Sequence, residues 1–235
     1  DVKPANFALG LQTDTEKASI VHVLDFGLAR NYCYPTEAEQ QHADDEVPRG
    51  VPTQWRCRVA RSSVHFRGTA KYCSPNAHDR LEQGRRDDLW SMMYMLIDFQ
   101  SGLPWAGAKG APATRKIKCY YDDNNLMINM PYELADIIPH LRKLDCYARP
   151  DYHSIHRKFL AVMYRLKIGY EDSYDWEPRG ETLLRPRLMP GWYEAAEFFS
   201  YDPIGELDPA QGKKEDENSK SNNGTDDETG DESKE

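Results

Sequence analysis

The stretch from Leu89 to Phe99 constrains the fold more than any other part of the sequence, because it is apolar on nearly every side when drawn as a helix. Asp87 and Asp88 precede it, where acidic side chains suit the exposed N–H groups and the dipole of a helix start. Gly102 and Pro104 end it. It is too short to span a bilayer. A helix that is apolar all round is buried, so other elements must surround it.

Shorter patterns supply those elements. Two runs of branched and aromatic residues, 7–11 and 20–24, flank a polar stretch and predict a β-hairpin. Helical periodicity predicts two further helices, over 132–144 and 151–168. Residues 27–63 show no period and accumulate Pro, Arg, Gln and acids, which predicts a long loop. The body of the chain is therefore predicted to be a strand pair followed by a helical bundle.

The net charge of −9 is unevenly distributed. Residues 201–235 contain 4 basic and 12 acidic side chains, so the first 200 residues are nearly neutral. Within them, residues 47–78 hold six basic side chains and no acid. The overall acidity argues against binding of nucleic acid or anionic lipid by the chain as a whole, since both need an excess of Lys and Arg. The basic stretch still allows a smaller anionic partner.

The cysteines and the amino terminus bear on location. Five cysteines without a Cys-x-x-Cys pair fit a reducing compartment better than a disulfide framework. The first residue is Asp1, and no charged-then-apolar leader follows it. We therefore expect a cytoplasmic or nuclear protein whose amino terminus is missing from this sequence.

Oxygen-bearing side chains and a lysine lie at the two ends of the predicted hairpin. Asp1, Lys3 and Asn6 precede the first strand, and Asp25 begins an Asp-Phe-Gly sequence after the second. Asn6 and Asp25 offer the hard oxygen ligands that Mg²⁺ prefers, so they are suited to hold a metal on a triphosphate. Lys3 can neutralise charge on a phosphoryl group, and Asp1 can accept the proton of an attacking hydroxyl. Either motif alone is weak evidence, but together they indicate phosphoryl transfer.

With these motifs the chain resembles the carboxyl-terminal lobe of a eukaryotic protein kinase. Residues 1–6 are similar to the catalytic loop from its Asp onward, and residues 25–27 to the metal-binding motif that opens the activation segment. Residues 66–76 are similar to the end of that segment. Asp88 falls where kinases place the Asp at the head of a buried central helix. The resemblance covers residues 1–177.

Finer details narrow the resemblance. Lys3, two residues after Asp1, follows the serine/threonine pattern. Four sequences are similar to the casein-kinase-I group: Asn-Ala-His at 76–78, Arg-Arg-Asp-Asp at 85–88, Leu-Pro-Trp at 103–105 and Pro-Asp-Tyr at 150–152. Three look most like the tau-tubulin kinases: Asn-Phe-Ala at 6–8, Asp-Leu-Trp-Ser at 88–91 and Asp-Trp-Glu at 175–177.

Composition predicts a linker over 178–205 and, because almost nothing there is apolar, an acidic disordered tail over 206–235. The resemblance implies a protein-kinase-like α+β fold, mainly helical and limited to the carboxyl-terminal lobe over 1–177. It implies a monomer that transfers the γ-phosphoryl group of Mg²⁺-bound ATP to Ser or Thr hydroxyls of protein substrates, with no nucleic acid or membrane partner. Acidic, already phosphorylated and cytoskeletal substrates would fit the subfamily.

The same resemblance assigns roles to individual residues. Catalysis falls to Asp1, Lys3 and Thr69, where Thr69 would position the other two. Binding of the nucleotide and its metal falls to Asn6, Asp25 and Gly27, with Asn6 and Asp25 as the metal ligands.

Departures from the kinase pattern matter as well. The sequence lacks a Gly-rich loop, a strand lysine, a helix-C Glu and a hinge, and the His-Arg expected before Asp1. We therefore expect this chain alone to bind ATP poorly and to transfer nothing measurable. The alternative is a non-catalytic pseudokinase or scaffold lobe that binds protein partners.

Two positions in the segment after the hairpin stand out. Asn76 occupies the place of the Glu that, in most kinases, forms a buried ion pair near Arg149, so that pair should be missing, as is normal for the group. Residues 50–63 look inserted relative to the tau-tubulin kinases. A mis-spliced gene model is our hypothesis, and a genuine loop insertion is the rival. Sequencing of the mature transcript separates them.

The basic stretch also has two interpretations. One is a solvated loop. The other is an anion site beside the active centre, formed by Arg49, Arg67 and Lys71, which would favour acidic or phosphorylated substrates as the family implies.

Overall fold

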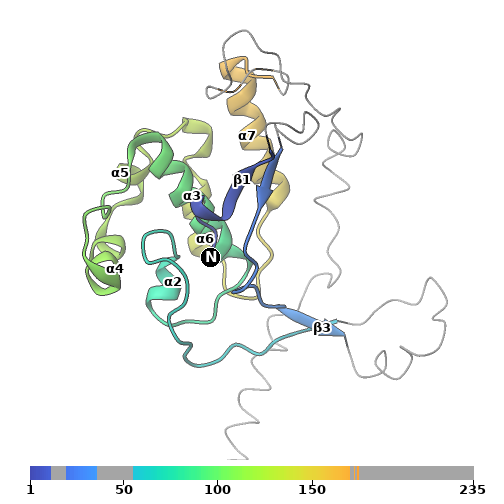
Figure 1. Ribbon diagram of the computed structural model, residues 1–235, viewed down its shortest axis with the longest axis vertical. Helices are drawn as coiled ribbons and strands as arrows, with labels where there is room; N and C mark the ends of the chain where they lie inside the picture. The colour runs from blue at the N-terminus through green and yellow to red at the C-terminus, as the bar shows by residue number, and fades with distance from the viewer. Residues whose placement is uncertain (12–19, 36–54, 170–171, 173, 175–235) are drawn as a thin grey trace, which may run out of the picture. The chain divides into compact units, whose positions relative to one another are not determined.

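The computed structural model describes residues 1–11, 20–35, 55–169, 172 and 174. The predictions for the linker over 178–205, for the tail over 206–235 and for Arg49 lie outside these residues. The described chain forms two compact units, one of Asp1–Asn31 with the residues from Ser62 on, and one containing Tyr32–Arg61. Figure 1 shows the elements of both units.

The predicted hairpin is confirmed, with shorter strands than expected. β1 (Phe7–Leu9) pairs antiparallel with β2 (Val21–Val23), and Phe7 lies opposite Val23. One backbone bond, from Leu24 N–H to the Asn6 carbonyl at 2.7 Å, extends the pairing toward the chain start. The two ends of the hairpin that carry the polar motifs therefore lie next to each other.

The predicted buried helix is also confirmed. α3 (Arg85–Ser101) contains the apolar stretch, and its buried residues include Trp90, Met93, Tyr94 and Ile97. Gly102 ends it with a positive φ of 78°, a conformation that glycine adopts without strain. Other helices and the loop after α3 pack around it in the larger unit, and the core residues that they contribute are Leu103, Trp105, Leu126, Met127, Leu134, Ile137, Ile138, Leu141 and Ile155.

The expected helix over 132–144 is wrong as a single element. The structure has a 3-10 turn, η2 (Tyr132–Leu134), followed by the separate helix α6 (Ile137–Lys143). Pro139 is the third residue of α6. Proline lacks the N–H that an interior helical position needs but is tolerated in the first turn, so a helix that includes it must begin close before it. The expected helix over 151–168 is confirmed as α7 (Tyr152–Leu166), with the Asp151 side chain accepting from the Ser154 N–H at its start.

Three helices were not predicted: α2 (Pro75–His78), α4 (Gly110–Tyr120) and α5 (Asp123–Met127). α2 and α5 are short. α4 lacks a clear apolar stripe because two of the side chains that it buries are polar, Thr114 and Lys118.

The long loop expected over 27–63 contains regular structure where it is described. β3 (Cys33–Pro35) pairs antiparallel with β4 (Trp55–Cys57) in the smaller unit. In the part of the chain that the structure describes, no helix is long and apolar enough to cross a membrane.

Candidate active site

A tight turn at the start of the chain folds Lys3 and Asn6 back onto Asp1. Pro4 opens the 3-10 turn η1 (Pro4–Asn6), where its fixed φ suits the first position, and the Asn6 N–H donates to the Lys3 carbonyl at 3.0 Å. Lys3 Nζ lies 2.7 Å from Asp1 Oδ2. The Asn6 amide, which is buried, donates through Nδ2 to the Asp1 carbonyl at 2.9 Å. The turn thus fixes both the side chain and the backbone of Asp1.

A segment far along the chain binds the other carboxylate oxygen. The Thr69 N–H donates to Asp1 Oδ1 at 3.0 Å. Gly68 precedes it with φ +92°, and a Cβ there would lie 3.4 Å from the same oxygen. A side chain at this position would therefore strain the backbone and crowd Asp1. The structure brings Asp1, Lys3, Asn6 and Thr69 together, and the contact from Thr69 comes from its backbone.

Asp25 directly follows Leu24, whose N–H donates to the Asn6 carbonyl. Its φ of 57° is left-handed, a conformation that Asp tolerates better than most residues, and its Oδ1 accepts the Gly27 N–H at 3.1 Å. Asp25 is exposed. Because Asn6 donates through Nδ2, its carbonyl oxygen Oδ1 remains an acceptor.

The donor set at Asn6 and Asp25 fits Mg²⁺. This ion commonly binds one or two protein oxygens and takes its other ligands from phosphates and water. Among the described residues, no group of three or more His, Cys, Asp or Glu side chains could hold a metal ion. A metal at Asn6 and Asp25 would therefore take its remaining ligands from phosphates and water.

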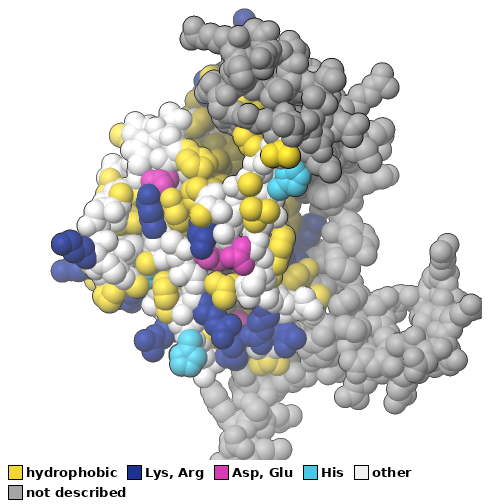
Figure 2. Space-filling view, viewed as in Figure 1, with side chains coloured by type: hydrophobic (Ala, Val, Ile, Leu, Met, Phe, Trp, Pro, Cys, Tyr) yellow, Lys and Arg dark blue, Asp and Glu magenta, His cyan; other side chains and the backbone are white. Residues whose placement is uncertain are grey.

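The three residues expected to form an anion site differ in their surroundings. Lys71 Nζ lies 2.7 Å from Asp98 Oδ2 on α3, and the Tyr72 hydroxyl donates to the same oxygen at 2.6 Å. The hydrogen bond to Asp98 raises the pKa of Lys71, and the charge of Lys71 is therefore largely balanced within the protein. Arg67 is exposed, and Arg49 lies outside the described residues. Figure 2 shows Lys and Arg side chains beside acidic ones on one face.

The sequence analysis missed Lys118, the most buried cation of α4. Its Nζ donates to the carbonyls of Ala70 at 2.8 Å and Cys73 at 2.6 Å. It also lies 4.7 Å from the ring centre of Tyr94 and 5.1 Å from that of Trp105, where the ring faces attract a cation. Burial lowers the pKa of Lys118 to about 8. No signal in the sequence distinguishes it from the surface lysines of a polar helix.

Trp105 also contacts the segment of residues 70–73. Its indole Nε1–H donates to the Lys71 carbonyl at 2.8 Å. Together with Lys118, it satisfies three carbonyls of residues 70–73, directly after the Thr69 N–H that binds Asp1. Lys118 and Trp105 therefore hold residues 70–73 in place, and Thr69, which directly precedes them, contacts the Asp1 carboxylate.

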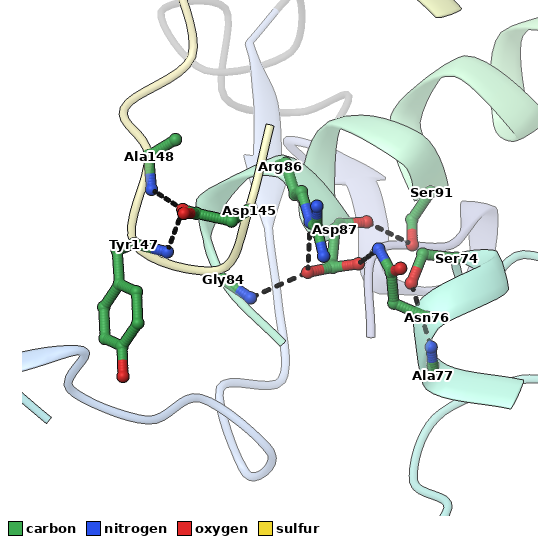
Figure 3. Close-up of polar contacts among 10 residues, drawn as sticks. All are labelled: Ser74, Asn76, Ala77, Gly84, Arg86, Asp87, Ser91, Asp145, Tyr147 and Ala148. Carbon is green, nitrogen blue, oxygen red and sulfur yellow. Dashed lines mark hydrogen bonds and ion pairs between the residues drawn. The ribbon is translucent and has the colours of Figure 1, made fainter. Parts of the chain in front are cut away.

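Asn76 makes a different contact from the Glu that it replaces. Its Nδ2 donates to Asp87 Oδ1 at 2.8 Å, and the Gly84 N–H donates to Asp87 Oδ2 at 2.7 Å (Figure 3). Asp87 is 4% exposed, whereas its neighbour Asp88 is exposed, so the buried acid at the head of α3 is Asp87. A neutral amide suits this place because a second carboxylate beside Asp87 would add like charge in a buried site.

Known proteins support these motifs. No protein-family model matches the chain. The inactive tau-tubulin kinase ttbk-6 of Caenorhabditis elegans is 37% identical over 208 residues, which cover 87% of this chain and 66% of the relative. A probable serine/threonine-protein kinase of Dictyostelium discoideum is 36% identical over 75% of this chain and 32% of its own length. A putative serine/threonine-protein kinase of C. elegans is 34% identical over 76% of this chain and 47% of its own length.

Motifs, geometry and relatives agree, and the chain belongs to the protein kinase family, with a protein-kinase-like fold. Within that family it is related to the tau-tubulin kinases. The chain spans just under two thirds of the first of these relatives and less than half of the other two.

Proposed function

We propose that this chain provides the catalytic and metal-binding residues of a serine/threonine protein kinase, which transfers the γ-phosphoryl group of ATP to hydroxyls of protein substrates. The observation that carries the proposal is the Asp1 carboxylate, bound on one oxygen by Lys3 and on the other by the Thr69 N–H. Positioning and charge stabilisation account for most of the catalysis of phosphoryl transfer, and this arrangement supplies both.

Each residue has a defined task in this proposal. Asp1 orients the substrate hydroxyl and accepts its proton, and Lys3, 2.7 Å from Asp1, offsets negative charge on the transferring group. Thr69 positions Asp1 through its backbone N–H. Asn6 and Asp25 would hold Mg²⁺, which when bound with ATP neutralises charge on the phosphates. Gly27 supports Asp25 through its N–H.

We further propose that residues 1–177 correspond to the carboxyl-terminal lobe alone, followed by a linker over 178–205 and a tail over 206–235. Two features support this: the relatives are longer than the region that matches them, and the kinase motifs found in the sequence are those of the carboxyl-terminal lobe. By analogy with the tau-tubulin kinases, the substrates would be acidic, phosphorylated or cytoskeletal proteins in the cytoplasm. Arg67 is the exposed cation best placed in sequence to contact them.

The test replaces the two carboxylates in the protein encoded by the complete transcript. Asp1→Asn and Asp25→Asn should each lower phosphoryl transfer from labelled ATP to an acidic Ser/Thr peptide by about 10²-fold to 10⁴-fold. Asp136→Asn is the matched control, because Asp136 is an exposed carboxylate that pairs with Lys158 away from the candidate site, and it should leave transfer unchanged. Wild-type turnover in Asp1→Asn would show that these residues do not perform the chemistry.

A second candidate is a non-catalytic lobe that binds protein partners. One relative bears the name of an inactive tau-tubulin kinase, which favours this possibility. The discriminating observation is the coding sequence immediately before Asp1. A Gly-rich loop, an Ala-x-Lys strand and a His-Arg pair there would favour the enzyme. Their absence from the mature transcript would favour the binding protein.

A further inference from the structure

Two cysteines lie directly opposite each other in the smaller unit. In the antiparallel pair of β3 and β4, Cys33 is the register partner of Cys57. The next pair outward is Tyr32 with Arg58, and the Arg58 N–H donates to the Tyr32 carbonyl at 2.9 Å. Hydrogen-bonded and non-hydrogen-bonded pairs alternate along an antiparallel ladder. Cys33 and Cys57 therefore form a non-hydrogen-bonded pair.

This kind of pair brings side chains close together. The Cα atoms of a non-hydrogen-bonded pair lie about 4.5 Å apart, and its side chains approach more closely than those of the alternative pair. A disulfide needs Cα atoms about 4.4 to 6.8 Å apart. The register thus places two thiols, separated by 24 positions in the sequence, at a distance that a disulfide can bridge without a change of strand pairing.

The two thiols are also reachable by small reagents. The structure has no disulfide at either residue, and both side chains are partly exposed. Cys73, by contrast, is 7% exposed, and burial raises the pKa of its thiol. Burial likewise raises the pKa of the half-buried Cys146. Cys119 is exposed, which makes it a reference for a single accessible thiol.

We propose that Cys33 and Cys57 form a redox-sensitive pair that closes to a reversible cross-strand disulfide when it meets a small disulfide such as oxidised glutathione. One thiolate attacks the glutathione disulfide, and a mixed disulfide forms as the first glutathione thiolate leaves. The second cysteine thiolate then attacks the protein sulfur, and the second glutathione leaves. The protein is oxidised by two electrons, glutathione disulfide is reduced by two, and the two thiol protons end on the two glutathione molecules.

The cross-link would change the segment that follows the hairpin. It lies between the Asp25-Phe26-Gly27 motif and Gly68-Thr69, and it closes a ring of chain from residue 33 to residue 57. Loop closure restricts the conformations that this stretch can adopt. A reversible bond agrees with the reducing compartment expected from the five cysteines, because it forms only when the oxidant is in excess. The proposal stands whether or not the protein transfers phosphate, and it applies to the chain in which residues 50–63, including Cys57, are present.

The experiment equilibrates the full 235-residue chain in glutathione buffers of increasing oxidised fraction, then blocks remaining thiols in acid and digests with trypsin. Cleavage at arginines places Cys33 on peptide 31–49 and Cys57 on peptide 57–58. We expect mass spectrometry to find these two peptides joined. In native buffer the joined form should persist at a ratio of reduced to oxidised glutathione about tenfold higher than in urea, since only the folded strands hold the thiols together.

Three variants complete the design. Cys33→Ser and Cys57→Ser should each abolish the joined peptides and leave the remaining thiol as a glutathione adduct. Cys119→Ser should leave the joined peptides at their wild-type yield. The proposal is overturned if the pair forms as readily in urea as in native buffer. It is equally overturned if Cys33 joins Cys119 or Cys146 as often as Cys57.

Discussion

Helices α3 and α4 bury their inner faces by different means. α3 fills the core with large apolar side chains such as Trp90, Met93 and Ile97. α4 buries Thr114, whose hydroxyl donates to the Gly110 carbonyl at 3.0 Å, and Lys118, whose ammonium group donates to two carbonyls of residues 70–73. An apolar face is stabilised by area and packing, but a buried cation is stabilised only while each donor keeps its partner. The first helix therefore supports the fold, and the second holds a particular segment in place.

The largest effect is expected from the apolar helix. Trp90→Ala removes a side chain that is 2% exposed and whose ring centre lies 5.4 Å from that of Tyr94. We expect a loss of about 3 to 5 kcal/mol in the free energy of unfolding, from lost burial and the cavity left behind. Urea unfolding followed by circular dichroism measures it. If the loss were as small as that of a substitution at an exposed site, α3 would not be the centre of the core.

The burial of Lys118 should make the free energy of unfolding depend on pH. The folded-state pKa of Lys118 is lowered to about 8 from 10.5, so between these values the folded state binds fewer protons than the unfolded state. Stability should therefore rise as pH increases from about 8 toward 10.5, by on the order of 3 kcal/mol from this group. Lys118→Met should lack this rise, so the difference in unfolding free energy between wild type and variant should change with pH.

Tyr72 keeps the same neighbours in both proteins and cancels in the difference between the two curves. Burial raises the pKa of the Cys73 thiol and the charge of Lys118 opposes that rise, so the difference reports Lys118 together with its effect on that thiol. Parallel curves for wild type and Lys118→Met would contradict the buried position of the ammonium group.

A polar contact at the head of α3 gives a smaller effect. Asn76→Ala removes the hydrogen bond to Asp87 and should cost about 1 kcal/mol. Asn76→Glu restores the residue typical of most kinases but places a carboxylate against a buried one, so we expect about 2 to 3 kcal/mol. The comparison of the two variants in urea is decisive. If Asn76→Glu lowered the free energy of unfolding less than Asn76→Ala, the buried Asp87 carboxylate would not be the reason for an amide at position 76.

The smallest effect is expected on the outer face of α4. Arg115 pairs with Asp79 at 2.6 Å, and both side chains are largely open to solvent. Exposed ion pairs contribute little because water and salt screen them. Arg115→Gln should leave the urea midpoint within experimental error, while Lys118→Met on the same helix shifts it. A clear shift of the urea midpoint in Arg115→Gln would contradict the expected difference between the exposed and the buried face of α4.

Several elements could be predicted because a local pattern is enough to form them. The run that is apolar on nearly every side predicts the buried helix α3, and two runs of branched and aromatic residues around a polar stretch predict the pairing of β1 and β2. The polar ends of the hairpin meet because antiparallel pairing requires it, so Asp1, Asn6 and Asp25 could be grouped in advance.

Other features could not be predicted because their causes lie far away in the sequence. The resemblance implied that Thr69 positions Asp1, but not that its backbone N–H does so across 68 positions. Lys118 reaches Ala70 across 48 positions. Lys71 was expected to face an anionic partner, yet it pairs with Asp98 from a helix that begins 14 residues later. The strand pair of β3 and β4 was hidden because its strands, Cys-Tyr-Pro and Trp-Arg-Cys, do not belong to runs of branched and aromatic residues such as those around β1 and β2.

Local motifs and composition were enough to predict the protein's family and its buried helix, and they supplied the candidate residues of the proposed phosphoryl transfer. Only the tertiary structure decided which backbone groups fix the Asp1 carboxylate, that a lysine is buried beneath residues 70–73, and that Cys33 faces Cys57. The physical reason is that hydrogen bonds and strand register depend on which distant segments meet. That choice is made by the packing of the whole core rather than by any single stretch of chain.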